Sequence, residues 1–480
     1  MTRWTTALIA LATGCADKTI DAATAPPALS TVDSGSPDDE PPPDDEGEDG
    51  CIKINGTGGY ATIKSAITEA VDGDTITLCG ETYNERVIIT KALTIKGPST
   101  GSPAVINGPS DDPAISIRSD NVELGWVTVN GSGNAIYIQD VDNIGLRKVA
   151  FNTAGDTAIR ASGSTNVLLQ ASDFDSLENG VIHIDESGSM RVVNCTFENI
   201  SGYAARVRTG ATLSLEGNTF TSNLTDEDGR NAAVRATDNA LLYSSGNTFT
   251  DNGGASISAY NSLVQSINDS FTGGTHAISS TGGPVTVNQA EITHPTITGI
   301  KARSTEGSVS ITNSTLIADP ATNALAGAEN WTLGRADEGI GIYASADEVI
   351  TLDNLTITGF NHGGIHFIRG GPDDVQATLN QITLTNIGWH GVYGKEANAT
   401  ITDVSVTNLR VSEEADSDLC TKVGDHGGAT FRDSTIDWQG GGVSNGAGIG
   451  ISGIESAMTF SGISIQDNSC AGIMNYQGSL

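Results

Sequence analysis

Four side chains that could bind an anion or transfer a proton recur along this sequence at nearly regular intervals. Arg160, His183 and Arg206 are separated by 23 residues each, and Arg235 follows 29 residues later. A guanidinium group can hold carboxylate or sulfate through two parallel hydrogen bonds. A histidine among such groups could remove the proton next to a bound carboxylate. The spacing therefore predicts recognition of an anionic ligand, with proton abstraction as its accompanying chemistry.

An apolar repeat explains how these side chains would come to lie side by side. One apolar row includes Ile159, Ile182, Ala205 and Val234, each directly before one of the four. A second row keeps the same phase, with successive spacings of 23, 23, 23, 29 and 22 residues, and comprises Phe151, Phe174, Phe197, Phe220, Phe249 and Phe271. Such self-similarity predicts a solenoid in which each repeat forms one coil.

The composition agrees with coils built from short strands. Glycine accounts for 58 of 480 residues, aromatic residues for only 5%, and Val/Ile/Thr-rich runs alternate with Asn, Gly and Asp. This pattern is typical of strands joined by tight turns. Asn218 and Asn247 stand two residues before a row phenylalanine, where turn amides could stack and satisfy backbone groups.

The N-terminal part of the body resembles a known class of proteins. Residues Tyr60–Leu78, Tyr83–Ile89 and Leu93–Gly97 are similar to the opening of right-handed parallel β-helix proteins of the pectate-lyase-like superfamily. The resemblance extends over nearly all of 51–480. It implies an all-β, right-handed parallel β-helix solenoid of about 14–16 coils, with an N-terminal capping α-helix near Ile63–Ala70.

The resemblance does not choose an activity, because this fold serves lyases, hydrolases, esterases, epimerases, adhesins and phage spikes. The motif sets of pectinesterases, polygalacturonases and mannuronan epimerases are absent, and so are glycine-rich calcium repeats. Only Asp425–Gly428 is distantly similar to part of the polygalacturonase pattern.

The start of the chain predicts export. Residues 1–15 read as a lipoprotein signal peptide with Cys15 as the lipidation site, although an ordinary secretory signal is the alternative. Residues 16–50 form an acidic, Pro-rich disordered linker, 51–113 the N-terminal cap and first coils, and 114–480 the β-helix coils. We expect a cell-envelope protein, lipid-anchored and either surface-exposed or periplasmic, or otherwise secreted. The chain would contact a membrane only through the lipid anchor.

Export permits disulfides. Cys51 and Cys79 flank the first predicted coil and could join its two ends. Cys195 takes the place of the turn asparagines and reads as a buried free thiol. Cys420 and Cys470 lie about two coils apart, which is too far for a disulfide unless a loop folds back.

The charge is strongly negative but unevenly placed. The net charge of −34 disfavours nucleic acid as a partner. Because side chains alternate along a strand, the residue after each inward isoleucine points outward, as does the residue two further on. Extended to Gly450 and Met474, these two rows hold eight Arg or Lys among 28 positions and only one acidic residue. The bases are therefore concentrated on one strand face.

Roles can be assigned along this face. The predicted catalytic residues are His183, Arg206, Arg208 and Arg235, near Asp185. The predicted substrate-binding residues are Tyr137, Arg160, Lys301, Arg303, Tyr343, His366, Tyr393 and Lys395. Ca²⁺ held by Asp226 and Asp228 is the candidate cofactor, and no other is expected. Histidines 362, 366, 390 and 426 form a second cluster, with an imidazole-lined metal site as its functional reading.

Long, acidic or aromatic segments are expected to wall a groove beside this face, and Trp331 and Trp438 belong to them. The favoured partner is an acidic polysaccharide, either a polyuronate or a sulfated glycan, which the chain would bind and could cleave as a polysaccharide lyase by β-elimination. The alternative is a non-enzymatic structural or adhesive surface lipoprotein whose basic stripe balances its acidic loops.

Overall fold

A computed structural model describes residues 50–110, 113–223, 232–323, 338–371, 374–409, 427–446 and 448–480. These residues belong to one unit that spans 45–480, separate from 1–44. The signal peptide, Cys15 and almost all of the acidic linker lie outside the described residues, so the predicted domain boundaries stay predictions.

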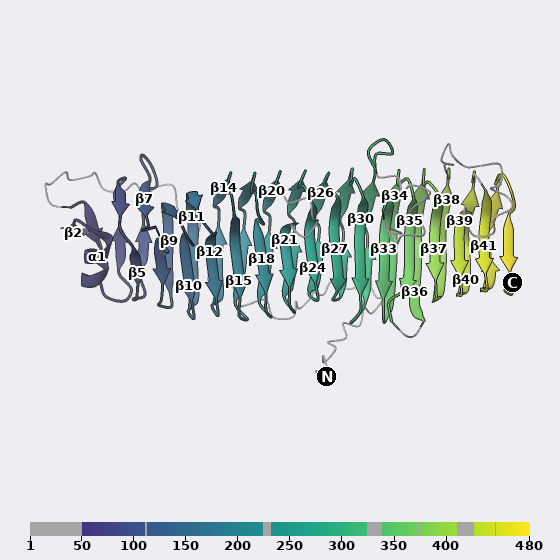
Figure 1. The fold of residues 1–480 in the computed structure, drawn as a ribbon, viewed down its shortest axis with the longest axis horizontal. Coiled ribbons are helices and arrows are strands. Elements are labelled where there is room, and N and C mark those ends of the chain that lie inside the picture. The colour runs from purple at the N-terminus through teal and green to yellow at the C-terminus, as the bar shows by residue number, and fades with distance from the viewer. Residues whose placement is uncertain are drawn as a thin grey trace, which may run out of the picture. The chain divides into compact units, whose positions relative to one another are not determined.

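The described chain is a right-handed parallel β-helix of about 16 turns, as the sequence predicted. Its strands stack side by side from the first coils at the α1 end to β44 (Figure 1). One sheet has 16 strands, all paired in parallel: β5 (Val87–Ile89), β8 (Ile115–Ile117), β10 (Ile136–Gln139), β12 (Thr157–Ser162), β15 (Gly180–Asp185), β18 (Ala205–Arg208), β21 (Ala232–Thr237), β24 (Ala255–Tyr260), β27 (His276–Gly282), β30 (Thr298–Ser304), β33 (Ile340–Ala346), β35 (Gly363–Arg369), β37 (His390–Lys395), β39 (Gly427–Arg432), β41 (Ile449–Ile454) and β44 (Ile473–Tyr476).

The rest of each coil, either two short strands or one long strand, belongs to a 28-stranded sheet, in which only β1 pairs antiparallel, with β2 and β3. Its strands are β1 (Ile52–Ile54), β2 (Thr57–Tyr60), β3 (Thr75–Thr77), β4 (Thr82–Asn84), β6 (Thr94–Lys96), β7 (Ala104–Asn107), β9 (Val122–Gly131), β11 (Asp142–Ala154), β13 (Thr165–Gln170), β14 (Asp173–Asp175), β16 (Ser189–Val193), β17 (Thr196–Glu198), β19 (Thr212–Glu216), β20 (Thr219–Thr221), β22 (Leu241–Ser245), β23 (Thr248–Thr250), β25 (Leu263–Ile267), β26 (Ser270–Thr272), β28 (Val285–Asn288), β29 (Glu291–Thr293), β31 (Val309–Thr312), β32 (Thr315–Ile317), β34 (Val349–Thr358), β36 (Val375–Thr385), β38 (Ala397–Thr407), β40 (Thr435–Ser444), β42 (Ala457–Ser461) and β43 (Ser464–Gln466).

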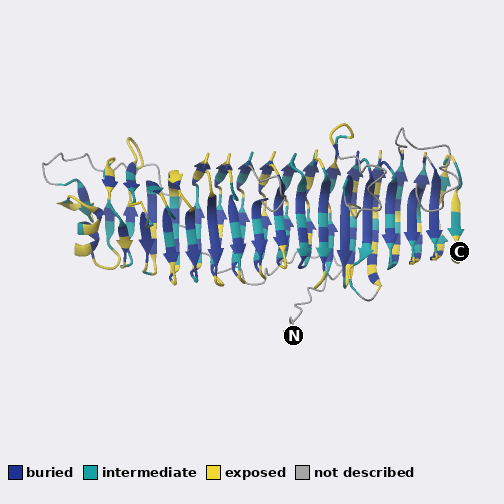
Figure 2. Cartoon of the chain, viewed as in Figure 1, coloured by how far each residue is buried: buried dark blue, intermediate teal, exposed yellow. Residues whose placement is uncertain are grey.

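The core lies inside the coils and is formed by buried residues of successive strands, which Figure 2 colours dark blue. The rings of Phe197, Phe220 and Phe249 stack with centroids 4.8 and 4.7 Å apart and planes inclined by only 4° and 6°. All three are fully buried. Stacked aromatic rings combine a large buried area with a favourable ring–ring geometry, which fixes the register of the coils.

Turn amides form the hydrogen-bonded ladder that the sequence predicted. The side-chain oxygen of Asn218 accepts from the backbone N–H of Cys195 at 2.9 Å, and that of Asn247 accepts from Asn218 N–H at 2.8 Å. The Asp269 carboxylate continues the ladder by accepting from Asn247 N–H at 2.7 Å. These contacts satisfy backbone donors that the turn would otherwise bury unpaired.

The helix α1 (Ile63–Glu69) begins at Thr62, whose side chain accepts from Ser65 N–H. Its first turn also donates to the Glu85 carboxylate, from Ile63 N–H at 2.8 Å and Lys64 N–H at 3.0 Å. A negative group near the positive, N-terminal end of the helix dipole stabilises the helix. The apolar face of α1 is buried against the first coils, which fits the predicted cap.

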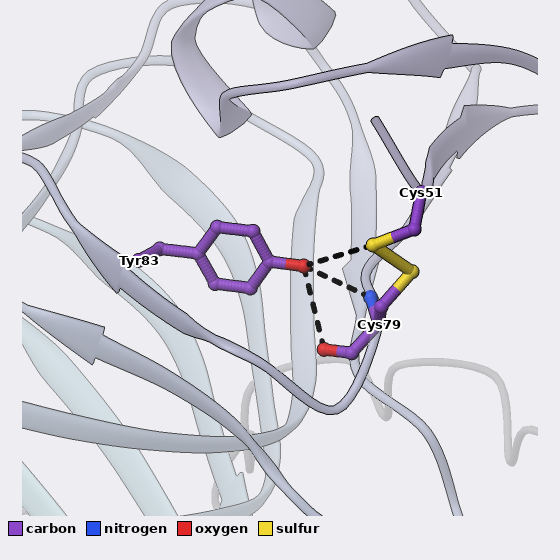
Figure 3. Close-up of a disulfide and its surroundings, with 3 residues drawn as sticks. All are labelled: Cys51, Cys79 and Tyr83. Carbon is purple, nitrogen blue, oxygen red and sulfur yellow. Dashed lines mark hydrogen bonds between the residues drawn. A yellow bond between two sulfur atoms is a disulfide. The ribbon is translucent and has the colours of Figure 1, made fainter. Parts of the chain in front are cut away.

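A disulfide joins Cys51 and Cys79, as the sequence suggested (Figure 3). The Tyr83 hydroxyl accepts from Cys79 N–H at 3.0 Å beside it, and burial raises the pKa of Tyr83. Cys195 is a buried free thiol, as predicted, and burial raises its pKa to about 11. Cys470 is also disulfide-bonded, and its partner lies outside the described residues.

Two features correct the sequence prediction. Trp438 is not in a surface loop: it lies in β40, fully buried among core residues. The strand β39 was not predicted, because its inward position holds Ala429 instead of a large aliphatic residue.

Within the described residues, no helix is long and apolar enough to cross a bilayer.

Candidate functional site

The 16-stranded sheet places the predicted side chains in one row. Ile159, Ile182, Ala205 and Val234 are paired from coil to coil and are fully buried. The residues that follow them pair in the same way and point to the outer face: Arg160, His183, Arg206 and Arg235. At about 4.8 Å per coil, these four side chains span roughly 14 Å. The outer face of this sheet is called the basic face below.

The last coils of the basic face differ from the predicted register. Val392 pairs with Ala429, and Ala429 pairs with Ile451. Ile451, and not Ile449, therefore continues the inward row. The outward positions are therefore Thr430 and Ser452 in place of Gly450. The correction adds Arg432, which pairs with Lys395, to the bases on this face.

Asp185 divides the arginines into two groups. Its Oδ2 lies 3.2 Å from Arg160 Nη2 and 3.3 Å from Arg208 Nη2, and His183 Nε2 lies 3.8 Å away. Burial acts to raise the pKa of Asp185, but the positive charge of Arg160 and the hydrogen bond from Arg208 act against burial, and the pKa lies below its ordinary value. The negative charge of Asp185 thus compensates the positive charges of Arg160 and Arg208.

His183 is a neutral imidazole within this charged surrounding. Burial and the nearby positive charge of Arg208 lower its pKa to about 4, against the opposing effect of Asp185. The side chain is only 8% exposed, and its Nε2 has no hydrogen-bond partner. A neutral nitrogen of this kind can accept a proton.

Arg206 has a different environment from Arg160 and Arg208. Its guanidinium lies over the ring of Tyr203, 5.8 Å from the ring centre, and no carboxylate of the described residues pairs with it. The Tyr203 ring packs against the backbone of Gly180, where a side chain on that glycine would collide with it. A guanidinium over an aromatic ring gains a cation–π attraction, and its N–H groups can still donate to an incoming anion.

Tyr203 was missed by sequence reasoning because it precedes β18 and was not among the outward positions. A signal was present, since an aromatic residue at this register stands next to a glycine on the neighbouring coil. Arg160 forms a similar pair with Tyr137, at 5.9 Å from the ring centre. Asp226 and Asp228, the predicted Ca²⁺ ligands, lie outside the described residues, and so do Trp331 and most of the other segments predicted to wall a groove.

Farther along the same face, Lys301 pairs with Tyr343 between adjacent coils, and Arg303 lies over the Tyr343 ring at 4.9 Å. This is the third arginine–tyrosine pair on the face. Tyr343 is 9% exposed, so its ring serves mainly as a support for the guanidinium.

Three histidines of the second predicted cluster, His362, His366 and His390, come together but are covered, and His426 lies outside the described residues. The ring of His366 lies 5.5 Å from His362, 6.1 Å from His390 and 5.2 Å from Tyr393. His366 is only 2% exposed, and burial lowers its pKa well below the ordinary value. Its outward register was predicted correctly, but the ring is not presented to solvent. A side chain on Gly363 would meet its Nε2, which shows how closely the backbone packs against it.

Lys395 Nζ lies 3.2 Å from a carboxylate oxygen of Glu396. Its charge is therefore compensated by a carboxylate, as that of Arg160 is. Among the described residues, no group of three or more His, Cys, Asp and Glu side chains has metal-binding geometry. A shallow open pocket lies beside α1, away from the basic face, and is lined by Tyr60, Thr62, Lys64, Ser65, Thr68 and Glu69.

Comparisons with known proteins support the fold. Residues 113–271 match the family described as right handed beta helix region. A comparison with curated protein sequences finds no significant relative.

Similar solved structures include a double mutant of the periplasmic alginate epimerase AlgG, at 11% identity over 90% of this chain and 93% of that one, with a TM-score of 0.32. PfbA, a surface adhesin of Streptococcus pneumoniae, has 11% identity over 87% of each chain and a TM-score of 0.33. A family 6 polysaccharide lyase from Pseudopedobacter saltans has 12% identity over 78% of this chain and 90% of that one, with a TM-score of 0.32. Similarities this low say nothing of activity. The strand pairing together with the family match identifies the chain as a right-handed parallel β-helix.

Proposed function

We propose that the basic face binds an acidic polysaccharide, with Arg206 as the central anion-binding residue. The observation that carries this proposal is the guanidinium of Arg206, which lies over Tyr203 without a carboxylate partner among the described residues, within a row of register-matched bases. In a chain of net charge −34, such a concentration of bases on one strand face favours a ligand with repeated negative charges. Coils repeat at about 4.8 Å, so an extended polymer could contact several of them.

The proposal extends to β-elimination at the same place. Arg206 would neutralise the carboxylate of a uronate, and His183 Nε2, which is buried in this conformation and would first have to turn outward, would take the proton from the neighbouring carbon. The electron pair of that C–H bond would form the new C=C bond, the bond to the glycosidic oxygen would break, and this oxygen would take a proton from water. Burial is the largest cause of the low pKa of His183, and a bound carboxylate would offset only the arginine charges that lower it further.

Affinity measurements on one variant test the binding. Arg206→Gln is expected to weaken binding of polygalacturonate or alginate by about 2 kcal/mol, roughly 30-fold, because a charge-assisted hydrogen bond is lost. Arg191→Gln is the matched control, since Arg191 lies in β16 on the other sheet, paired with Glu216. The measurement is titration calorimetry of the full chain.

Equal affinities of Arg206→Gln and the unmodified chain would contradict the assignment of this face. Cleavage is tested separately by the ultraviolet absorbance of unsaturated uronate products. His183→Gln is expected to abolish that signal while leaving binding within a few-fold. Absence of the signal in the unmodified chain would limit the function to binding.

A further inference from the structure

A second outer surface carries a chemistry that the basic face lacks. On the last short strand of each coil, or the last part of the long strands β34, β36, β38 and β40, the two residues that flank the inward phenylalanine or its aliphatic equivalent point outward. From β20 to β43, 16 of these 20 positions are threonine or serine. They are Thr219, Thr221, Thr248, Thr250, Ser270, Thr272, Glu291, Thr293, Thr315, Ile317, Thr356, Thr358, Thr383, Thr385, Ser405, Thr407, Gly442, Ser444, Ser464 and Gln466. This surface is called the threonine face.

The threonine face is regular from coil to coil. Thr219 and Thr221 pair directly with Thr248 and Thr250, and these pair in turn with the next coil. The phenylalanine rings beneath this part of the face are 4.8, 4.7 and 4.9 Å apart, with planes inclined by 4°, 6° and 8°. The strands therefore stack with little twist, and the surface above them is flat.

Its side chains are held in fixed positions. Threonine is branched at Cβ and has few accessible rotamers on a strand. Some hydroxyls also bond to each other along the stack, as Thr272 does with Thr293 at 3.0 Å and Thr385 with Thr407 at 3.3 Å. The result is an ordered array of hydroxyl and methyl groups, repeated about every 4.8 Å across the coils and about every 6.7 Å along a strand.

The threonine face is almost uncharged, with Glu291 as its one ionisable residue, although the chain carries a net charge of −34. An acidic polysaccharide therefore finds no counter-charge here. A protein partner would be expected to use aromatic or arginine anchors, and this face has neither. The matching ligand is flat, uncharged, rich in hydrogen bonds and periodic on the scale of a few ångströms.

We propose that the threonine face binds ice. Ice is a lattice of water molecules whose oxygens recur on this length scale, and a fixed array of hydroxyls and methyls can order water in the same arrangement. This inference is independent of the proposed function, because the threonine face and the basic face lie on different strands of each coil.

The test is ice activity of the full chain, measured as thermal hysteresis, the shape of single ice crystals and inhibition of recrystallisation. Thr248→Lys combined with Thr250→Lys should remove most of this activity, because two long charged side chains in the middle of the array prevent close contact. Thr378→Lys combined with Thr400→Lys is the matched control. These two exposed threonines pair on adjacent coils and lie in the first half of β36 and β38, outside the threonine face.

The expected result is activity in the unmodified chain and the control, with loss in the Thr248 and Thr250 variant. Circular dichroism shows whether each variant keeps its strands. The proposal is overturned if the unmodified chain has no effect on ice. It is also overturned if the folded Thr248 and Thr250 variant stays fully active, or if the control loses as much activity.

Discussion

At the scale of single residues, chemically identical side chains differ by their neighbours. Arg160 and Arg208 both pair with Asp185, whereas Arg206 lies on Tyr203 without a described carboxylate partner. The sequence could predict that these arginines share one face, because that follows from strand alternation. It could not predict which of them Asp185 compensates, since that depends on side-chain conformation across two coils.

His183 should make stability sensitive to acid. Its pKa is about 4 in the folded chain and near 6.5 when unfolded, so between these values the unfolded state binds more protons. The contribution of neutral His183 to the unfolding free energy is therefore fully present above pH 6.5 and is lost as the pH falls toward 4. We expect His183→Gln to reduce the loss of unfolding free energy between pH 7 and pH 4.5, as measured by denaturant titration.

The exposed residue His294 provides the control, as His294→Gln. If both variants lose the same free energy between these pH values as the unmodified chain, the buried neutral state of His183 is wrong. Some acid sensitivity will remain in either case, because burial also lowers the pKa of His362 to about 4.

At the scale of elements, periodicity was a reliable guide wherever large side chains mark the inward row. The phenylalanine stack and the asparagine ladder are both confirmed. The prediction failed at β39, where glycines and Ala429 carry no apolar signal, and the register of the following coil was displaced. Trp438 shows the opposite error, because a large aromatic residue near a long insertion looked like loop and is core.

The asparagine ladder makes a prediction of its own. Asp269 ends the ladder with a buried carboxylate, and this burial raises its pKa. A raised carboxyl pKa means that ionised Asp269 costs stability at neutral pH, a cost that disappears when the group is protonated. Asp269→Asn should therefore raise the unfolding free energy at pH 7, with a smaller gain at acid pH.

Denaturant titrations of this variant at pH 7 and pH 4 make the comparison. Asn247→Asp, one coil earlier in the same ladder, is the complementary control and should lower stability at pH 7. A loss of stability in Asp269→Asn at pH 7 would show that the charge itself is required, with Ser266 as the donor that depends on it.

At the scale of the whole described body, stability should be a sum of coil terms and contacts between neighbouring coils. The Cys51–Cys79 disulfide closes the first coil, far along the stack from His183 and Arg206. Reduction of this disulfide is expected to increase hydrogen exchange in 50–110 while leaving 157–208 protected. Mass-spectrometric hydrogen exchange, with the Cys51→Ser and Cys79→Ser double variant for comparison, measures this directly. Equal loss of protection in both regions would show that the body unfolds as one unit.

The central claim is that Arg206 binds the anionic group of a polysaccharide on the basic face. The most direct test is a crystal structure of the full chain with an oligogalacturonate. The account predicts sugar density along β12, β15, β18 and β21, with a carboxylate in contact with Arg206 and beside Tyr203. An oligosaccharide bound on any other face, or density that leaves Arg206 without an anion, would contradict it.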